Sequence, residues 1–322
     1  MNNRLFITGG AGYLGYNIIK KYYDKTDITV YSRDEAKHYY LKKEFPKVNC
    51  IIGDVRNFDL MKRASKGHSL GIFAASLKQI GAVDQNYEES VRVIIDGAIN
   101  SRRCAEENDM RAACFISSDK SRSATTLYGA MKFVAGESFI VNSEKNQKSF
   151  FDLNHQTYLS TAIYGNVFNS TGSIIPLIWD SINKNYELTL YSEEMTRFML
   201  TVDRAINLIE FGFSKNGYNV IPRVKSFKIK DLFEIYKEKF GLKYKTGEPR
   251  ISEKIHEIMV SKEEIARTNY DKETDNFFMH YEKIQNLDNK ELFFPNDEYS
   301  SRDFTVTKEE LNEILYKNDY YK

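Results

Sequence analysis

Two pairs of residues that could move protons lie within one short stretch of the chain, SSDKSRSATTLYGAMK. Asp119 and Lys120 are adjacent, and Tyr128 lies four residues before Lys132. On a helix the second spacing places both side chains on one face, where an ammonium group stabilises phenolate and lowers the tyrosine pKa. A tyrosine in that state can take the proton of an alcohol while hydride leaves the carbon, so the second pair predicts alcohol oxidation.

The first pair indicates a second reaction step. Asp119 and Lys120 follow a predicted strand, at the sheet edge where open α/β folds bind their ligands. Oxidation alone needs no second pair, whereas elimination of water needs a base for a carbon-bound proton and an acid for the departing hydroxyl. We therefore predict that both pairs serve one pocket, and that the Ser118 hydroxyl orients the substrate or the Tyr128 hydroxyl.

A glycine-rich turn, ITGGAGYLGYN, lies near the start of the chain. Gly9, Gly12 and Gly15 follow a predicted strand and open a predicted helix. In that context glycines allow a tight turn, and the free N–H groups of the helix bind a pyrophosphate. The turn therefore predicts a dinucleotide site.

The end of the second predicted strand bears on the choice of cofactor. In VYSRDEAK, Ser32 and Arg33 come first and suit a 2′-phosphate, which favours NADP. Asp34 and Glu35 follow closely, so NAD remains possible. The residues expected to contact the cofactor are Thr8, Gly9, Gly12, Tyr13, Leu14, Gly15, Ser32, Arg33, Asp54, Val55, Ala74, Ala75 and Lys132.

Short apolar runs alternate with amphipathic helical stretches in the first half of the chain. Strands are predicted at residues 4–8, 27–32, 49–53, 70–76 and 112–118, and helices at 13–24 and 87–108. This alternation predicts an α/β fold, a Rossmann-type doubly wound parallel sheet with helices on both faces. We expect residues 1–165 to bind the cofactor and residues 166–322 to bind substrate, with segments returning to the sheet and small irregular additions after Gly247.

Composition narrows the class of protein. The 322 residues carry a formal charge of +1 with both signs interspersed, which favours neither nucleic acid nor an anionic membrane as a partner. Cys50, Cys104 and Cys114 are far apart and suggest free thiols, without a metal site. No apolar run approaches the ~18 residues of a membrane helix, and the first strand begins at once. A cytoplasmic protein is expected.

Several sequence blocks in order resemble the UDP-N-acetylglucosamine 4,6-dehydratases of bacterial surface-glycan and flagellin-sugar synthesis, of the C5-inverting type, within the extended short-chain dehydrogenase/reductase superfamily. The blocks are TGGAGYLG, YSRDE, GDVRN, AASLKQ, SSDK with LYGAMK, YGNV with GSIIP, MTRFMLTVD, EKIHE and YSS. The resemblance implies that Asp119 protonates the C6 hydroxyl and that Lys120 takes the C5 proton. It assigns C4 oxidation to Tyr128 and Lys132, with hydride passing to NADP+ and back to C6.

The same resemblance implies a UDP-sugar site. Lys78 and Asn166 match pocket residues, Arg197 and Arg250 match cations for the diphosphate or uridine, and Glu253 matches a carboxylate of the nucleotide site. A homo-oligomer, possibly a hexamer, is also expected from the family. Residues 121–126 depart from the usual proline-containing stretch of the family.

Other interpretations remain open from the sequence. One is a nucleotide-sugar 4-epimerase, or a dehydratase of another sugar nucleotide, in which replacing Lys120 would spare simple epimerisation. Another is a Rossmann binding protein without catalysis, which would have no need of both proton-handling pairs. The sequence leaves inversion or retention at C5 undecided.

Overall fold

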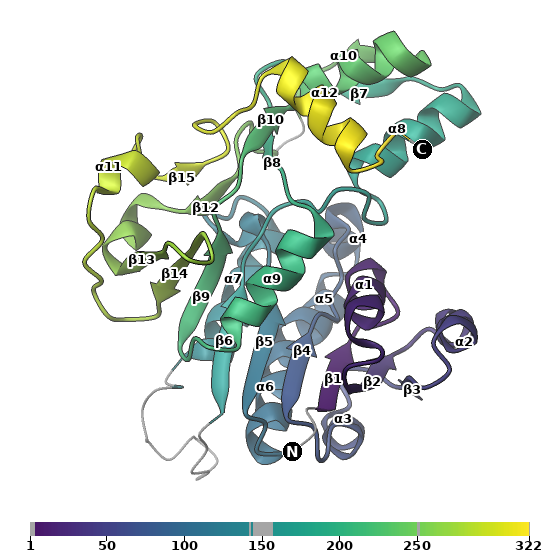
Figure 1. Ribbon diagram of the computed structural model, residues 1–322, viewed down its shortest axis with the longest axis vertical. Helices are drawn as coiled ribbons and strands as arrows, with labels where there is room; N and C mark the ends of the chain where they lie inside the picture. Colours follow the sequence, from purple (N-terminus) through teal and green to yellow (C-terminus); the bar gives the residue numbers. More distant parts are fainter. Residues whose placement is uncertain (1–3, 142, 144–156, 250–251, 322) are drawn as a thin grey trace.

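A nine-stranded sheet lies at the centre of the computed structural model, which describes residues 4–141, 143, 157–249 and 252–321 (Figure 1). The strand order is β13-β14-β9-β6-β5-β4-β1-β2-β3. Strands β1 to β6 and β9 run parallel, while β14 and β13 add an antiparallel hairpin at one edge. The bounds are β1 (Arg4–Thr8), β2 (Asp27–Ser32), β3 (Asn49–Ile52), β4 (Leu70–Phe73), β5 (Ala112–Ile116), β6 (Tyr158–Ala162), β9 (Tyr218–Pro222), β13 (Thr268–Asp271) and β14 (Asn276–His280).

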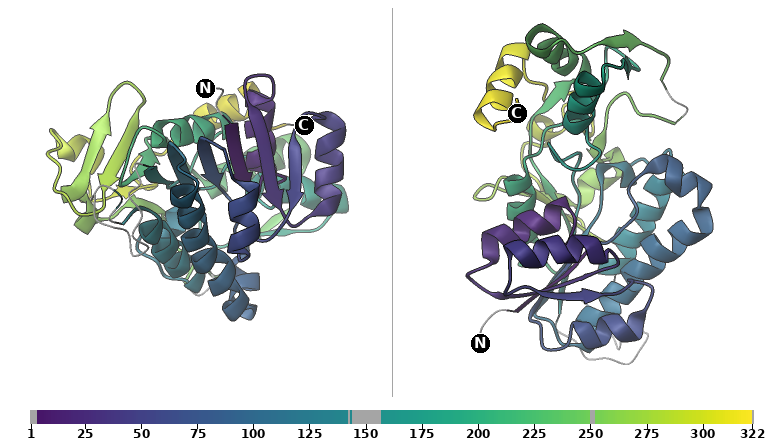
Figure 2. Two further views of the ribbon diagram at one scale, coloured as in Figure 1. Left: turned by 90° about the horizontal axis from the view of Figure 1, so that it is seen from below. Right: turned by 90° about the vertical axis from the view of Figure 1, so that its right-hand side faces the viewer.

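Helices cover both faces of this sheet (Figures 1 and 2). One core cluster joins α1, α2 and α9 to one face, and a second joins α3, α4, α6 and α7 to the other. The prediction of a Rossmann-type, doubly wound α/β fold is confirmed. The bounds are α1 (Tyr13–Tyr22), α2 (Glu35–Glu44), α3 (Phe58–Ala64), α4 (Ile80–Gln85), α5 (Tyr87–Val91), α6 (Gly97–Glu107), α7 (Leu127–Ile140) and α9 (Val202–Gly212).

The helix predicted at residues 87–108 is interrupted by a π-helical turn. This turn, Arg92–Asp96, joins α5 to α6. Its Val93 lines a cavity at the glycine-rich turn. Such single-turn bulges re-aim side chains inside a helix and are frequent near ligand sites.

A smaller region lies beyond the carboxyl ends of the parallel strands (Figure 1). Helices α8, α10 and α12 pack together there around buried aromatic and aliphatic side chains. Three strand pairs, β7 with β11, β8 with β10 and β12 with β15, connect these helices to the large sheet. The bounds are α8 (Ile174–Lys184), β7 (Leu188–Leu190), β8 (Thr196–Phe198), β10 (Ser226–Lys228), α10 (Ile229–Phe240), β11 (Tyr244–Thr246), β12 (Ile258–Val260), α11 (Lys290–Phe293), β15 (Tyr299–Ser300) and α12 (Lys308–Lys317).

The prediction of small irregular additions after Gly247 is wrong. Strand β14 pairs with β9 of the large sheet, and Phe277 and Met279 are fully buried. Helix α12 begins with a capping box of Thr307 and Glu310 and buries Leu311 and Leu315. The sequence did not predict these elements because the exposed face of α12 and the edge hairpin are rich in Lys, Glu and Asn, which hides the apolar pattern of the buried residues.

Candidate active site

Asp119 and Lys120 lie just past the carboxyl end of β5, in a short 3-10 turn, Asp119–Ser121. The Asp119 side chain is 1% exposed. Its Oδ1 accepts hydrogen bonds from Ser118 Oγ at 2.8 Å and from the Lys120 backbone N–H at 2.9 Å. Lys120 Nζ lies 3.3 Å from the same oxygen. The structure thus holds an acid, an amine and a hydroxyl together, as the sequence predicts for this stretch.

A second buried carboxylate, that of Glu257, joins this group. Its Oε1 lies 3.1 Å from Lys120 Nζ and 3.6 Å from Arg197 Nε. Glu257 was not among the predicted site residues, although it ends the EKIHE block that also supplies Glu253. The result is a compact cluster of two carboxylates and two cations.

The pKa values in this cluster move in different directions. Burial raises the pKa of Asp119, with Lys120 opposing and Glu257 adding to the rise. Burial also disfavours an ionised Glu257, but Lys120 and Arg197 together hold its pKa below the ordinary value. For Lys120, burial lowers the pKa, and the two carboxylates more than reverse this effect. Asp119 is therefore the carboxyl that tends to keep a proton, and Glu257 the one that tends to be ionised.

Tyr128 and Lys132 share one face near the start of α7, as the spacing predicts, and both are buried. Lys132 Nζ donates to the Ile116 carbonyl at 3.0 Å, and burial lowers its pKa to about 8. Burial raises the Tyr128 pKa to about 12, while Lys120 and a hydrogen bond with Ser118 act in the opposite direction. The net shift of the Tyr128 pKa is thus upward, contrary to the prediction of a pKa lowered by Lys132, and the cation that opposes the rise is Lys120.

A cavity of ≈ 360 Å³ lies at the glycine-rich turn. A Cβ on Gly9, whose φ is +70°, would lie 3.0 Å from the Ala75 backbone, so this turn leaves no room for a side chain. The predicted cofactor residues that line the cavity are Gly9, Gly12, Ser32, Arg33, Asp54, Val55 and Ala75. A backbone turn of this kind at the start of α1 fits a dinucleotide.

The other predicted cofactor residues do not line this cavity. Thr8 Oγ1 accepts a hydrogen bond from the Ala75 N–H at 3.2 Å. Tyr13, Leu14 and Ala74 pack against the core under α1. A Cβ on Gly15 would lie 2.3 Å from the preceding turn, so this glycine allows the helix to approach. Lys132 lies in α7 and is absent from the lining.

Two cations that follow β2 in the chain, Arg33 and Lys37, line the cavity at the glycine-rich turn. The Asp34 carboxylate instead caps α2, accepting the Lys37 backbone N–H at 3.0 Å, and lies 3.0 Å from Lys37 Nζ. Asp54 is paired with Arg56 through two contacts of 2.9 and 2.7 Å. The lining therefore carries two cations, Arg33 and Lys37, and two carboxylates, Asp34 and Asp54, and Arg33 Nη1 lies 3.9 Å from Asp54 Oδ2.

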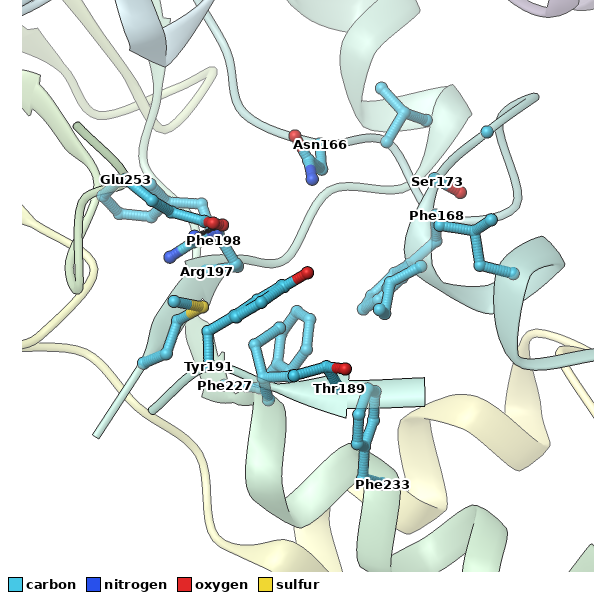
Figure 3. Close-up of a pocket in the computed structure, with 16 residues that line it drawn as sticks. Asn166, Phe168, Ser173, Thr189, Tyr191, Arg197, Phe198, Phe227, Phe233 and Glu253 are labelled. Carbon is cyan, nitrogen blue, oxygen red and sulfur yellow. Dashed lines mark hydrogen bonds and ion pairs between the residues drawn. The ribbon is translucent and has the colours of Figure 1, made fainter. Parts of the chain in front are cut away.

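A second cavity, of ≈ 210 Å³, opens between β8, α8 and β7. Figure 3 shows Arg197 and Glu253 on one side of it and Ser173 on the other, with Asn166 above and Tyr191 across the floor. Arg197 Nη2 lies 3.3 Å from Glu253 Oε1. The structure thus brings Asn166, Arg197 and Glu253 together, as predicted.

Two features of this cavity differ from the sequence prediction. Ser173, which was not predicted, is buried at the start of α8, and its Oγ has no hydrogen-bond partner within the described part of the chain. Lys78 lies outside the lining, is exposed, and donates to the Thr171 carbonyl at 2.5 Å. Arg250 falls outside the described residues.

The stretch between the two proton-handling pairs is anchored by Arg122, whose side chain is 1% exposed. Arg122 Nη2 lies 2.9 Å from Glu137 Oε1, and Nη1 lies 2.5 Å from Glu264 Oε1. Lys254 Nζ donates to the Arg122 carbonyl. Residues 121–126, which depart from the family pattern, are therefore tied to α7 and to the C-terminal region.

The described residues contain no group of three or more His, Cys, Asp and Glu side chains that could hold a metal ion. No helix in residues 4–141, 157–249 or 252–321 is long and apolar enough to cross a membrane. Cys104 and Cys114 are buried free thiols, and Cys50 is partly buried.

Three curated relatives resemble the chain over most of its length. A Methanocaldococcus jannaschii chain named as an uncharacterized membrane protein is 30% identical, covering 98% of this chain and 96% of its own. The UDP-N-acetylglucosamine 4,6-dehydratase (inverting) of Campylobacter jejuni is 30% identical over 81% of this chain and 78% of that protein. The UDP-glucose 4-epimerase of Rickettsia bellii is 28% identical over 99% and 97%.

Solved structures share the fold, and a family model matches most of the chain. Pen from Bacillus thuringiensis has a TM-score of 0.86 at 24% identity and covers 99% of this chain and 98% of its own. DesIV of Streptomyces venezuelae, a dTDP-glucose 4,6-dehydratase solved with NAD, has a TM-score of 0.66 at 15% identity, over 78% and 86%. The model described as polysaccharide biosynthesis protein matches residues 5–278. With its Rossmann sheet and its buried proton-handling cluster, the chain belongs to the polysaccharide biosynthesis protein family, among the extended short-chain dehydrogenases/reductases.

Proposed function

We propose that this protein dehydrates UDP-N-acetylglucosamine to a UDP-4-keto-6-deoxy-N-acetylhexosamine with inversion at C5, using NADP, in surface-glycan synthesis. The observation that carries the proposal is the contact between buried Asp119 and Lys120 beside Tyr128, with Lys120 Nζ 3.3 Å from Asp119 Oδ1. Oxidation alone uses no such acid and amine, whereas elimination needs both.

The first step is oxidation at C4. Tyr128 takes the C4 hydroxyl proton, Ser118 orients its phenol by hydrogen bonding, and Lys132 lies one turn later on α7. NADP, when bound, supplies the hydride acceptor for C4 and the donor for C6. Ser32, Arg33 and Lys37, which line one end of the cofactor cavity, would hold the 2′-phosphate.

The second step removes water across C5 and C6. The new C4 keto group makes the C5 proton acidic, and Lys120 takes it. Asp119, whose pKa is raised by burial, donates its proton to the C6 hydroxyl, which leaves as water. A proton then returns to C5, and inversion requires that it arrive on the face opposite the one from which Lys120 took the first.

The substrate's nucleotide fits the second cavity. Arg197 offers a planar donor to the diphosphate, and Ser173 adds an unpaired hydroxyl at the start of α8, where helix N–H groups favour anions. Asn166 and Glu253 complete the polar lining. On this proposal residues 1–165 hold the cofactor and residues 166–322 the sugar nucleotide, and the protein forms a homo-oligomer.

Product analysis by NMR in deuterated buffer tests the proposal. Incubation with UDP-N-acetylglucosamine and NADP+ should give a 4-keto-6-deoxy sugar with deuterium at C5 and inverted configuration. Unchanged substrate from a protein that binds NADP+ rejects the proposal.

A second candidate, a UDP-sugar 4-epimerase, is supported by the near full-length similarity to the Rickettsia bellii enzyme. An epimerase would keep the C6 hydroxyl and invert C4. It would also tolerate Lys120→Ala, a change that should abolish dehydration.

A further inference from the structure

Glu257 is a buried carboxylate to which the proposed reaction gives no role. Its side chain is 3% exposed, and Oε1 contacts Lys120 Nζ at 3.1 Å. The other oxygen, Oε2, has no hydrogen-bond partner among the residues that the structure describes. An ionised carboxylate is costly to bury with one oxygen unpaired, so a site that retains one invites a functional explanation.

The position of Glu257 is fixed by the C-terminal part of the chain. The Glu257 N–H donates to Ser301 Oγ at 2.9 Å, and the Ser301 N–H donates to the Glu257 carbonyl at 2.8 Å. Ser301 Oγ also lies 2.7 Å from Thr196 Oγ1, next to Arg197 in β8. The backbone of Glu257 is therefore pinned where its side chain reaches Lys120.

The proposed dehydration makes two opposite demands on the Asp119–Lys120 pair. Asp119 must hold a proton to donate, and Lys120 must be neutral to accept one. Lys120 lies between the carboxyl groups of Asp119 and Glu257, which raise its pKa, so it is an ammonium before substrate binds. An Asp119 that already holds its proton cannot take another, so Glu257 is the remaining acceptor in contact with Lys120.

We infer that Glu257 accepts the Lys120 proton before elimination, across the 3.1 Å contact. One N–H bond of Lys120 breaks and one O–H bond of Glu257 forms, and no other atom or electron moves. The ion pair becomes a neutral pair without a change in net charge. In the free protein the pKa shifts oppose this transfer, since the carboxyl groups raise the pKa of Lys120 and the cations lower the pKa of Glu257. Exclusion of water by bound substrate reduces that cost, because desolvation penalises the ion pair more than the neutral pair.

This inference rests on the proposed dehydration, and it makes Glu257 a positioning residue that acts through Lys120. The titratable and charged groups that face the pair are Asp119, Arg197, Lys254 and Tyr128. None of these substitutes for Glu257 as an acceptor. Arg197 and Lys254 are cations, the proposed reaction needs the Asp119 proton for the C6 hydroxyl, and Tyr128 receives the proton of the C4 hydroxyl.

The test compares Glu257→Gln, Glu257→Asp and the wild type by product formation and by deuterium entry at C5, over a range of pH. The wild-type rate should vary little around neutrality. In Glu257→Gln the rate at neutral pH should fall about 100-fold, the scale of one general acid–base contribution. It should then climb about tenfold per pH unit, because Lys120 can lose its proton only to solvent. Glu257→Asp should restore much of the loss.

Glu253→Gln is the matched control, since it makes the same change four residues away in a carboxylate that pairs with Arg197. It should raise KM without changing the pH profile. NADPH formation in a single turnover should survive in Glu257→Gln, because oxidation at C4 precedes the step that needs neutral Lys120.

Two results for an active wild type overturn the inference: an unchanged rate in Glu257→Gln, or a loss that neither higher pH nor Glu257→Asp repairs, which would mark a structural role. A wild-type protein that binds NADP+ but leaves the sugar unchanged rejects the dehydration, and this assignment with it.

Discussion

Replacing Arg122 with methionine should destabilise the fold while preserving side-chain volume. The change leaves two buried carboxylates without their shared cation, Glu137 at 2.9 Å and Glu264 at 2.5 Å. Breaking a buried pair in this way costs ~3–5 kcal/mol. The lower end applies here, because Glu137 keeps the Asn219 amide at 3.0 Å and Glu264 keeps Arg267 at 2.9 Å. We therefore expect a loss of about 3 kcal/mol.

Thermal unfolding measures this loss. With ~2.1 cal/mol/K per residue, the unfolding entropy of 322 residues is ~0.7 kcal/mol/K, so Tm should fall by roughly 4 °C. The matched control is Arg223→Met, which removes an arginine that is 42% exposed and 3.4 Å from Asp275. An exposed pair contributes at most about 1 kcal/mol, so its Tm should change by less than ~2 °C.

A second substitution separates lost charge pairing from a packing defect. Adding Glu137→Gln to Arg122→Met removes one of the unpaired charges and should recover part of the Tm. Equal Tm values for Arg122→Met and Arg223→Met, or no recovery in the double variant, would refute the reasoning from buried charge.

Further predictions concern the cofactor turn and α7. Arg33→Ser should weaken NADP+ binding by about 10–100-fold and leave NAD+ binding nearly unchanged, in fluorescence titrations, because only NADP carries the 2′-phosphate; equal losses for both would contradict this. Gly15→Ala should lower the free energy of unfolding, measured in urea, by at least ~1–3 kcal/mol, because its Cβ would lie 2.3 Å from the Gly10 backbone. Gly81→Ala is the control: a Cβ there would meet nothing within 4 Å, so the change should be neutral or slightly stabilising. The pKa of Lys132 is 10.5 in the unfolded chain and about 8 in the folded protein. Between these pH values the unfolded chain binds more protons, so the free energy of unfolding should rise by about 3 kcal/mol as the pH increases. Lys132→Met should remove that rise, and an unaltered pH dependence would argue against a buried amine. Tyr128→Phe should cut single-turnover NADPH formation by at least about 100-fold while NADP+ still binds.

The first five strands and the glycine-rich turn were predictable, because local patterns specify them. A buried parallel strand is continuously apolar, as in β5, and a helix that follows a glycine turn has its own spacing. Asp119, Lys120, Tyr128 and Lys132 come together because the 14 residues from Asp119 to Lys132 contain one 3-10 turn and the start of α7. Local chain geometry alone places them.

The contributions from distant parts of the chain were not predictable in the same way. The burial of Glu257 depends on pairing with residues near 300, and the burial of Arg122 depends on Glu264. Sequence periodicity carries no information on such long-range ion pairs, because a Glu or Arg is assigned to the surface by composition alone. The direction of the Tyr128 pKa shift was missed for the same reason, since it depends on how deeply the phenol is buried.

The pinning of Glu257 by Ser301 also has a consequence for the order in which the protein matures. The strands β1 to β5, which carry the glycine-rich turn and the proposed cofactor cavity, are complete by residue 116, and early-synthesised segments can begin to fold while the rest of the chain is still being made. Closing a contact from residue 120 to 257, and then from 257 to 301, must wait for nearly the whole chain to emerge. We therefore expect a nascent or C-terminally truncated chain to acquire its cofactor pocket before its elimination chemistry, and to be catalytically silent in the interval.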